Sequence, residues 1–316
     1  MTIWEGATVV ITGGSGSFGN ACTRRLLADG VKAIRCYSRD EWKQSEMAKR
    51  ITDPRIRFIL GDVRDRDRLR RAFEGADIVL HAAALKQVPA GERDPLEFKK
   101  TNVDGAANVI EAAIDAGVKR VMALSSDKSC APMNLYGKTK AVAESLFINA
   151  NTYSGNRVRF GVVRYGNVVG SRGSIVPLLM EQKAKGVVTL TDARCTRFWM
   201  TLGEAVRFVL DRTDDIPALY VPKLPSVGLP DLIEAVAPGC RVETIGLRDG
   251  EKIAEQMVSA DEAPYAYDRG DHYAIHQTVC AIPTLKAAYS SYTNEDFLSV
   301  AEIRERLPQA MTEAAM

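Results

Sequence analysis

The sequence predicts an α/β fold in which a doubly wound parallel sheet is joined to a smaller C-terminal lobe. Short apolar runs rich in β-branched residues alternate with helix-like segments through the first 165 residues. A glycine-rich turn also joins the first of these runs to a helix-like segment. After Asn167 the alternation loosens, and proline and glycine interrupt it. We therefore expect one domain over residues 1–166 and a lobe over 167–316 that is discontinuous with the sheet.

The predicted strands are the runs at residues 7–12, 33–37, 56–60, 77–83, 120–126 and 158–165. Their alternation with helical segments is typical of βαβ units, in which the strands are parallel and both faces of the sheet are covered. Helices are expected around 95–116 and 134–151. A further helix begins near Thr201, which forms a capping box with Glu204. Trp199, just before it, is expected in the core.

Composition excludes several classes of function. The 316 residues carry a net charge of +2, so neither nucleic acid nor an anionic membrane is an expected partner. The 6 cysteines form no CxxC pair and the 3 histidines form no helical pair, so no metal site is expected. No apolar stretch is longer than a strand, and we expect a cytoplasmic protein that acts on a small molecule.

The turn after the first strand has the pattern of a dinucleotide-binding loop. Gly13, Gly16 and Gly19 allow a tight turn, a close approach to a pyrophosphate and close packing of helix on strand. The helix that starts at Ser17 and Phe18 offers unpaired N–H groups to the phosphates. The sequence therefore predicts a Rossmann domain that binds a nicotinamide dinucleotide.

The end of the second strand bears on which cofactor is bound. NAD sites carry an acidic residue there for the ribose hydroxyls, whereas NADP sites carry cations for the 2′-phosphate. Ser38, Arg39 and Lys43 favour NADP, and the alternative is that Asp40 binds NAD. The other positions expected beside the cofactor follow the third and fourth strands and are Asp62, Val63 and Ala82.

A second group of reactive side chains follows the fifth strand, in "SSDKSCAPMNLYGKTK" at 125–140. Tyr136 and Lys140 are four residues apart, so they share one face of a helix. An ammonium beside a phenol favours the phenolate, which can take a proton from a substrate alcohol. Ser125 or Ser126, at the end of the strand, can supply a hydrogen bond. This pattern predicts alcohol oxidation.

These motifs resemble the extended short-chain dehydrogenase/reductase superfamily, and within it the inverting UDP-N-acetylglucosamine 4,6-dehydratases. The similar segments, in the family's order, are "TGGSGSFG", "YSRDEWKQSEMA", "GDVRD", "AAALKQVPAGERDP", "SSDKSCAPMNLYGKTK", "VVRYGNVVGSRGSIVP", "TRFWMTL" and "RDGEK". They extend over nearly the whole chain. The resemblance implies an NADP-dependent enzyme that acts on UDP-N-acetylglucosamine or a close UDP-sugar and forms homo-oligomers.

The resemblance also implies the roles of individual residues. Asp127 is the acid that protonates the departing C6 hydroxyl, and Lys128 is the base that takes the C5 proton. Tyr136 and Lys140 serve the oxidation at C4, with Ser126 as their hydroxyl neighbour. Lys86 resembles a position near cofactor and sugar, although a solvated loop lysine is an equal alternative. The positions that resemble substrate contacts are Asn167, Arg172, Arg248 and Glu251.

Two other functions stay open at this point. A UDP-sugar 4-epimerase or a simple reductase needs Tyr136 and Lys140 but has no use for Asp127 and Lys128. A non-enzymatic protein that senses NADP needs neither pair. The expected product of the dehydratase is UDP-2-acetamido-2,6-dideoxy-β-L-arabino-hex-4-ulose, formed by C4 oxidation, loss of water and return of the hydride to C6.

Overall fold

The structure is a computed structural model that describes residues 2–170, 174–277 and 285–315. The chain forms two compact units. Unit 1 comprises Met1–Ser125, Leu135–Val163 and Val206–Tyr220, and unit 2 comprises Ser126–Asn134, Arg164–Ala205 and Val221–Met316. The chain therefore passes between the units several times, and residues 126–134 leave unit 1 directly after a strand of its sheet.

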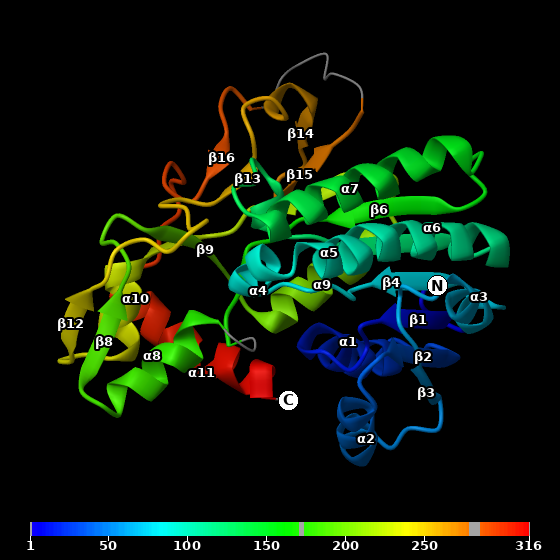
Figure 1. Ribbon diagram of the computed structural model, residues 1–316, viewed down its shortest axis with the longest axis horizontal. Helices are drawn as coiled ribbons and strands as arrows, with labels where there is room; N and C mark the ends of the chain where they lie inside the picture. Colours follow the sequence, from blue (N-terminus) through cyan, green and yellow to red (C-terminus); the bar gives the residue numbers. More distant parts are fainter. Residues whose placement is uncertain (1, 171–173, 278–284, 316) are drawn as a thin grey trace. The chain divides into compact units, whose positions relative to one another are not determined.

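Unit 1 contains a parallel sheet with the strand order β10, β6, β5, β4, β1, β2, β3 (Figure 1). Every pairing along this series is parallel. Val9, Val10 and Ile11 are all fully buried, as expected for a strand covered on both faces. The predicted α/β fold is therefore confirmed. The strands of this sheet are β1 Thr8–Thr12, β2 Ala33–Ser38, β3 Ile56–Leu60, β4 Ile78–His81, β5 Arg120–Leu124, β6 Arg159–Val163 and β10 Leu219–Pro222.

Helices α3, α6 and α7 of unit 1 pack in a row, α3 on α6 and α6 on α7. Asp65 caps α3 by accepting a hydrogen bond from the Arg68 N–H, and the arginines of this helix lie exposed. A π-helical stretch, η1, interrupts the helical segment predicted over 95–116. The helical elements are α1 Ser17–Ala28, α2 Glu41–Arg50, α3 Arg66–Phe73, α4 Val88–Arg93, α5 Pro95–Phe98, η1 Lys99–Asp104, α6 Gly105–Ala116, α7 Leu135–Tyr153 and α9 Leu202–Arg212.

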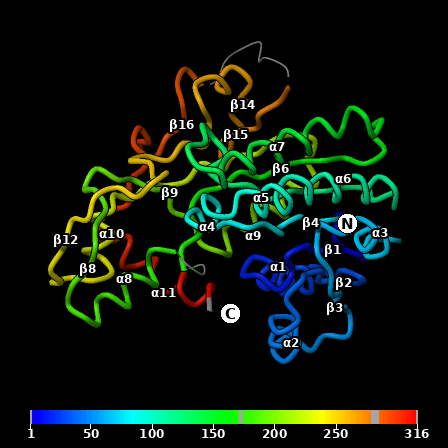
Figure 2. Tube along the Cα trace, viewed as in Figure 1, coloured from blue at the N-terminus to red at the C-terminus, as the bar shows by residue number. Residues whose placement is uncertain are grey.

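Unit 2 brings distant segments of the chain together around a separate core. Its green, yellow and red segments, which are far apart in the sequence, lie side by side in Figure 2. Trp199 is only 2% exposed within this core, as predicted. At the start of α9, the Thr201 N–H donates to Glu204 and the Glu204 N–H donates to the Thr201 hydroxyl, which confirms the capping box.

The strands of unit 2 are short and belong mostly to small separate sheets. The strand β9 pairs with β7 and β11, β8 pairs with β12, β13 pairs with β16, and β14 pairs with β15. The elements are η2 Asp127–Ser129, β7 Asn167–Val168, α8 Ile175–Lys183, β8 Val187–Leu190, β9 Thr196–Met200, β11 Ser226–Gly228, α10 Leu229–Val236, β12 Arg241–Thr244, β13 Gln256–Val258, η3 Ala263–Tyr265, β14 Ala266–Asp268, β15 His272–Ile275, β16 Tyr289–Ser290 and α11 Val300–Ala315.

None of the helices in the described ranges is long and apolar enough to cross a membrane.

Candidate functional site

The glycine loop of unit 1 joins β1 to α1 with the close contacts that a dinucleotide loop requires. Gly13 adopts a φ of +71°, and a Cβ there would lie 2.9 Å from the backbone nitrogen of Ala83. A Cβ on Gly19 would lie 2.3 Å from the carbonyl oxygen of Gly14. Helix α1 therefore begins at Ser17 directly against the loop, and its free N–H groups lie at the end of β1. This loop fits a dinucleotide pyrophosphate.

A buried hydroxyl network connects this loop to the end of β2. The Ser15 hydroxyl donates to the Ser38 hydroxyl at 2.9 Å, and Gln44 Nε2 donates to the Ser38 carbonyl and hydroxyl, both at 3.0 Å. Sequence reasoning found Ser38 but missed Ser15 and Gln44. In the sequence, Ser15 was marked only by its place between two loop glycines, and Gln44 only by its place in the first turns of the next helix.

The charged residues after β2 make two kinds of contact. Asp40 caps α2, because it accepts the Lys43 N–H at 2.9 Å and lies 2.5 Å from Lys43 Nζ. The Arg39 side chain is 51% exposed, with Nη1 3.8 Å from Asp62 Oδ2. The acidic residue of the NAD alternative is thus engaged by its own helix, while the Arg39 guanidinium extends toward solvent.

The segment after β3 is held by a local ion pair. Arg64 Nη2 lies 2.7 Å from Asp62 Oδ2, and the Tyr37 hydroxyl donates to the Asp62 carbonyl at 2.7 Å. Burial by itself raises the pKa of Asp62, but its hydrogen bonds to Arg64 outweigh burial and lower it. Val63, next to Asp62, is buried.

The loop after β4 is attached to the helix that carries the predicted catalytic pair. Asn102 bonds both backbone polar groups of Leu85, at 2.8 and 2.9 Å, and donates to the Thr139 hydroxyl at 3.0 Å. Ala82 lies against Gly13 of the glycine loop, while the Lys86 side chain is exposed. Like Ser15 and Gln44, Asn102 was missed by the sequence analysis.

Tyr136 and Lys140 lie on the first turns of α7 and are both buried, 9% and 6% exposed. Lys140 Nζ donates to the Leu124 carbonyl at the end of β5, at 2.6 Å. Burial lowers the pKa of Lys140 to about 8. The predicted i, i+4 pair on one helix is therefore present, and its lysine is anchored to the sheet.

His81, at the end of β4, is a buried neutral imidazole that the sequence analysis did not discuss. Its Nδ1 lies 2.8 Å from the Thr12 hydroxyl. Burial, aided by the nearby Lys140 charge, lowers the pKa of His81 to about 3. This contact joins the ends of the neighbouring strands β4 and β1.

In unit 2, the turn η2 presents Asp127 and Lys128. The Asp127 N–H donates to the Tyr165 carbonyl at 3.0 Å, and the Ser126 hydroxyl donates to Asp127 Oδ1 at 2.7 Å. The Ser129 hydroxyl closes the turn by donating to the Ser126 carbonyl at 2.6 Å. Ser126 therefore orients the Asp127 carboxyl group, which is completely buried.

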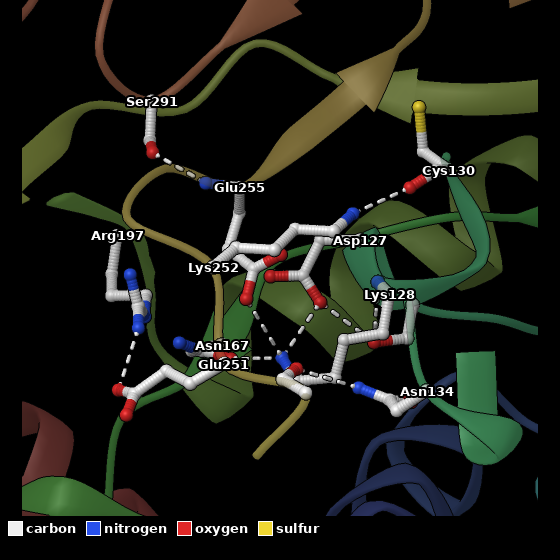
Figure 3. Close-up of polar contacts among 12 residues, drawn as sticks. Asp127, Lys128, Cys130, Asn134, Asn167, Arg197, Glu251, Lys252, Glu255 and Ser291 are labelled. Atoms are coloured by element: carbon white, nitrogen blue, oxygen red, sulfur yellow. Dashed lines mark hydrogen bonds and ion pairs between the residues drawn. The ribbon is translucent and has the colours of Figure 1, made fainter. Parts of the chain in front are cut away.

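The Lys128 ammonium lies among oxygen atoms (Figure 3). Its Nζ is 3.1 Å from Asp127 Oδ1, 3.1 Å from Asn167 Oδ1 and 3.6 Å from Glu255 Oε1. The structure thus brings together three of the predicted residues and adds Glu255, which the sequence analysis missed. Glu255 lies 127 positions from Lys128, and its only signal in the sequence was its place three residues after the segment "RDGEK".

A neighbouring segment of unit 2 holds two more of the predicted substrate residues, Arg248 and Glu251. Glu251 Oε1 lies 3.0 Å from Arg197 Nη2 and accepts from the Thr191 hydroxyl at 3.2 Å, while Glu251 Oε2 accepts the Arg248 N–H at 3.2 Å. The Arg248 side chain is exposed. Arg172 lies outside the described residues.

The Lys252 ammonium donates to the Cys130 carbonyl at 2.8 Å, and Asn134 Nδ2 donates to the Gly250 carbonyl at 3.1 Å, so residues 250–252 are bound to the segment after η2 (Figure 3). Within the described ranges, no three His, Cys, Asp or Glu side chains are grouped so as to hold a metal ion.

A doubly wound sheet, a glycine loop at the head of α1 and a Tyr and Lys pair on α7 define the extended short-chain dehydrogenase/reductase class. The chain belongs to the family described as polysaccharide biosynthesis protein, whose model matches residues 9–277. This membership and the relatives below agree with the family predicted from the sequence.

Three relatives illustrate the comparison. The chain is 46% identical over 277 residues to a protein of Campylobacter jejuni named UDP-N-acetylglucosamine 4,6-dehydratase (inverting), covering 86% of this chain and 83% of that one. It is 42% identical over 283 residues to a Rickettsia canadensis protein named UDP-glucose 4-epimerase, covering 85% and 82%. Among solved structures, Pen from Bacillus thuringiensis superposes with a TM-score of 0.92 at 34% identity, covering 98% of this chain and 99% of that one.

Proposed function

We propose that this protein is a C5-inverting UDP-N-acetylglucosamine 4,6-dehydratase. The observation that carries the proposal is the buried contact of Asp127 with Lys128, at 3.1 Å, beside Asn167. Elimination of water across C5 and C6 needs one acid and one base, and these residues are of the required types. The Campylobacter jejuni relative, at 46% identity, supports the same substrate and reaction.

In this mechanism the side chains of the chain perform the proton transfers. When bound, the nicotinamide cofactor accepts a hydride from C4 of the sugar and returns it to C6. Tyr136 takes the C4 hydroxyl proton, with Lys140 stabilising its phenolate, and the C4 ketone acidifies the C5 hydrogen. Lys128, as the neutral amine, takes the C5 proton, and Asp127 donates a proton to the departing C6 hydroxyl.

The second candidate is a UDP-sugar 4-epimerase, which the 42% identical Rickettsia canadensis relative favours. An epimerase needs Tyr136 and Lys140 but gives no role to an acid and a base buried together. The product distinguishes the two, because an epimerase leaves the mass of the sugar nucleotide unchanged and a dehydratase lowers it by one water.

The test is to incubate the chain with UDP-N-acetylglucosamine and catalytic cofactor in D₂O and to analyse the product by mass spectrometry and NMR. We expect loss of water, deuterium at C5, an L-arabino configuration, and a C6 methyl group without solvent deuterium. A D-xylo configuration at C5 would place the protein among retaining enzymes. An intact C6 hydroxymethyl group would exclude a dehydratase.

We further propose that the nicotinamide cofactor is NADP. Asp40, the residue that the NAD alternative requires, is engaged as the cap of α2, and Lys43 lies beside it. Arg39 is half-exposed and able to reach a 2′-phosphate, for which a guanidinium is well suited. Ser38 lies in the network with Ser15, where a hydroxyl can contact the same phosphate.

The substrate and assembly residues are proposals of the same kind. Arg248, with Arg172, suits the diphosphate, Glu251 a ribose hydroxyl, and Asn167 and Lys86 the sugar. A homo-oligomer formed through the α5, α6 and α7 region is supported by large exposed apolar side chains on α5 and α7, which are Leu96, Val142 and Tyr153. Sedimentation of the purified chain measures its oligomeric state.

A further inference from the structure

Glu255 places a second carboxyl group on the catalytic lysine proposed above. Glu255 Oε1 lies 3.6 Å from Lys128 Nζ, and Asp127 Oδ1 lies 3.1 Å from the same atom (Figure 3). The Asp127 and Glu255 side chains are only 1% and 4% exposed, and that of Lys128 is 25% exposed. Two carboxyl groups and one amine therefore share a site that is largely shielded from water.

Each carboxyl group of this cluster has an oxygen that lacks a protein partner. Asp127 Oδ2 and Glu255 Oε2 are buried and receive no hydrogen bond from the residues that the structure describes. A buried carboxylate oxygen without a donor is costly, whereas a proton on the carboxyl group removes its charge. Two carboxylates beside one ammonium would also leave a net negative charge in the site. A cluster of zero net charge that keeps its ammonium therefore holds one carboxylate and one carboxylic acid.

The main chain fixes Glu255 independently of Lys128. The Glu255 N–H donates to the Ser291 hydroxyl at 3.0 Å, and the Ser291 N–H donates to the Glu255 carbonyl at 2.8 Å. The Ser291 hydroxyl is itself hydrogen-bonded to the Thr196 hydroxyl at 2.8 Å. Glu255 directly precedes β13, which pairs with β16 through Gln256 and Ser290. A change of the Glu255 side chain therefore leaves its position on the backbone supported.

The dehydration requires Asp127 to carry a proton while Lys128 is a neutral amine. In a cluster of zero net charge, both conditions hold only when the second proton is on Glu255. We propose that Glu255 takes a proton from Lys128 Nζ and so converts Lys128 into the base that acts at C5, an inference that rests on the proposed dehydratase function.

In this step an N–H bond of the Lys128 ammonium breaks and an O–H bond forms on the Glu255 carboxylate, with no change in oxidation state. The cluster has zero net charge before and after the transfer, so no buried charge is created. Glu255 exchanges a proton only with Lys128. It is therefore a positioning residue that acts through Lys128, and not a catalytic residue.

The test is the Glu255→Gln variant, which keeps the shape of the side chain and its oxygen but cannot take a proton. Single-turnover absorbance follows the reduced nicotinamide, and mass spectrometry follows the loss of water. We expect the reduced nicotinamide to appear with close to the wild-type amplitude, KM to stay within about two-fold, and elimination to slow by about 100-fold or more. Elimination by the variant should rise more steeply with pH than in wild type, because Lys128 must then lose its proton to solvent.

Two other variants complete the experiment. Glu255→Asp retains a carboxylate but holds it one methylene farther from Lys128, so it should eliminate water at about a tenth of the wild-type rate and with an altered pH profile. Glu234→Gln removes the same charge from an exposed pair with Arg304 and should leave both steps unchanged. If Glu255→Gln does not fold, as judged by circular dichroism, Glu255→Asp decides, since a slowed elimination with an altered pH profile supports the proposal.

The inference is overturned if Glu255→Gln, or Glu255→Asp in its place, eliminates water at the wild-type rate with the wild-type pH profile. It is also overturned if the oxidation step slows as much as elimination, because Glu255 then supports the fold of the site generally. Wild-type protein that releases no water from UDP-N-acetylglucosamine would instead contradict the proposed function.

Discussion

Arg164 and Glu262 form one largely buried group of charges in unit 2, and Asp127, Lys128 and Glu255 form another. In the first, Arg164 Nη1 and Nη2 lie 2.9 and 2.8 Å from the two Glu262 carboxylate oxygens, and the Ser259 N–H donates to the same carboxylate at 2.9 Å. In the second, each carboxyl group retains one buried oxygen without a donor among the described residues.

The two groups differ in whether a proton can move within them. Burial by itself raises the pKa of Glu262, but the Arg164 guanidinium outweighs burial and lowers it to about 2, so both groups of that pair are charged at neutral pH. A fully hydrogen-bonded pair has no proton to exchange and serves the fold. A cluster with two carboxyl groups, one amine and unsatisfied oxygens can redistribute protons, which suits acid and base chemistry.

The largest expected effect is on catalysis, at Lys128. Lys128→Ala should lower kcat by about 1,000-fold or more, because elimination loses its base, while the reduced nicotinamide still accumulates. Tyr136→Phe should instead prevent the reduced nicotinamide from appearing at all. Stopped-flow absorbance with UDP-N-acetylglucosamine measures both.

Lys138→Ala is the matched control for these variants, because Lys138 is an exposed lysine on α7. It should turn over at the wild-type rate. Wild-type turnover by both Lys128→Ala and Tyr136→Phe would show that the two side chains have been given the wrong roles.

The second expected effect is on stability, at Arg164. Arg164→Met should lower the free energy of unfolding by about 3 kcal/mol, because it leaves the partly buried Glu262 carboxylate without its guanidinium partner. The double variant Arg164→Met/Glu262→Gln should regain part of this loss. Urea unfolding measures the stability, and activity per folded molecule should fall far less than in Lys128→Ala.

The pH dependence of unfolding is a second test of the ion pair between Arg164 and Glu262. Since folding lowers the pKa of Glu262 from an ordinary 4.5 to about 2, the pair contributes its full stability above about pH 4.5. That contribution, on the order of 3 kcal/mol, is lost as the pH falls through this window toward 2. Glu262→Gln should therefore flatten the dependence in acid, and an unchanged slope would contradict a charged Glu262 in the folded protein.

The smallest expected effect is at Arg39, whose side chain is 51% exposed and so differs from both buried groups. Arg39→Ala should weaken NADP binding about ten-fold through the loss of one charged contact with the 2′-phosphate. Binding of NAD, which lacks this phosphate, should change little, and fluorescence titration of both dinucleotides makes the comparison. Equal affinity of the variant and wild type for NADP would remove Arg39 from the cofactor site.

Much of unit 1 could be predicted because its signals are local. The strands, the glycine loop and the spacing of Tyr136 and Lys140 each lie within a few residues, where backbone geometry and periodicity determine what neighbours what. Asp127 and Lys128 directly follow a predicted strand, but their roles as acid and base were implied by the resemblance to the dehydratase family. Asn102 and Gln44 were missed because their hydrogen bonds join segments that no local pattern connects.

By itself the sequence determined the α/β class, the order of the strands along the chain, and the kinds of acid, base and phenol available for the chemistry. Tertiary structure alone decided which charges meet. Glu255 reaches Lys128 because β13 pairs with β16 and because η2 is bonded to the Tyr165 carbonyl. Arg164 likewise acquires Glu262 across 98 positions. Such contacts arise from the packing of distant segments. That packing also decides whether each oxygen of a buried carboxyl group receives a hydrogen bond.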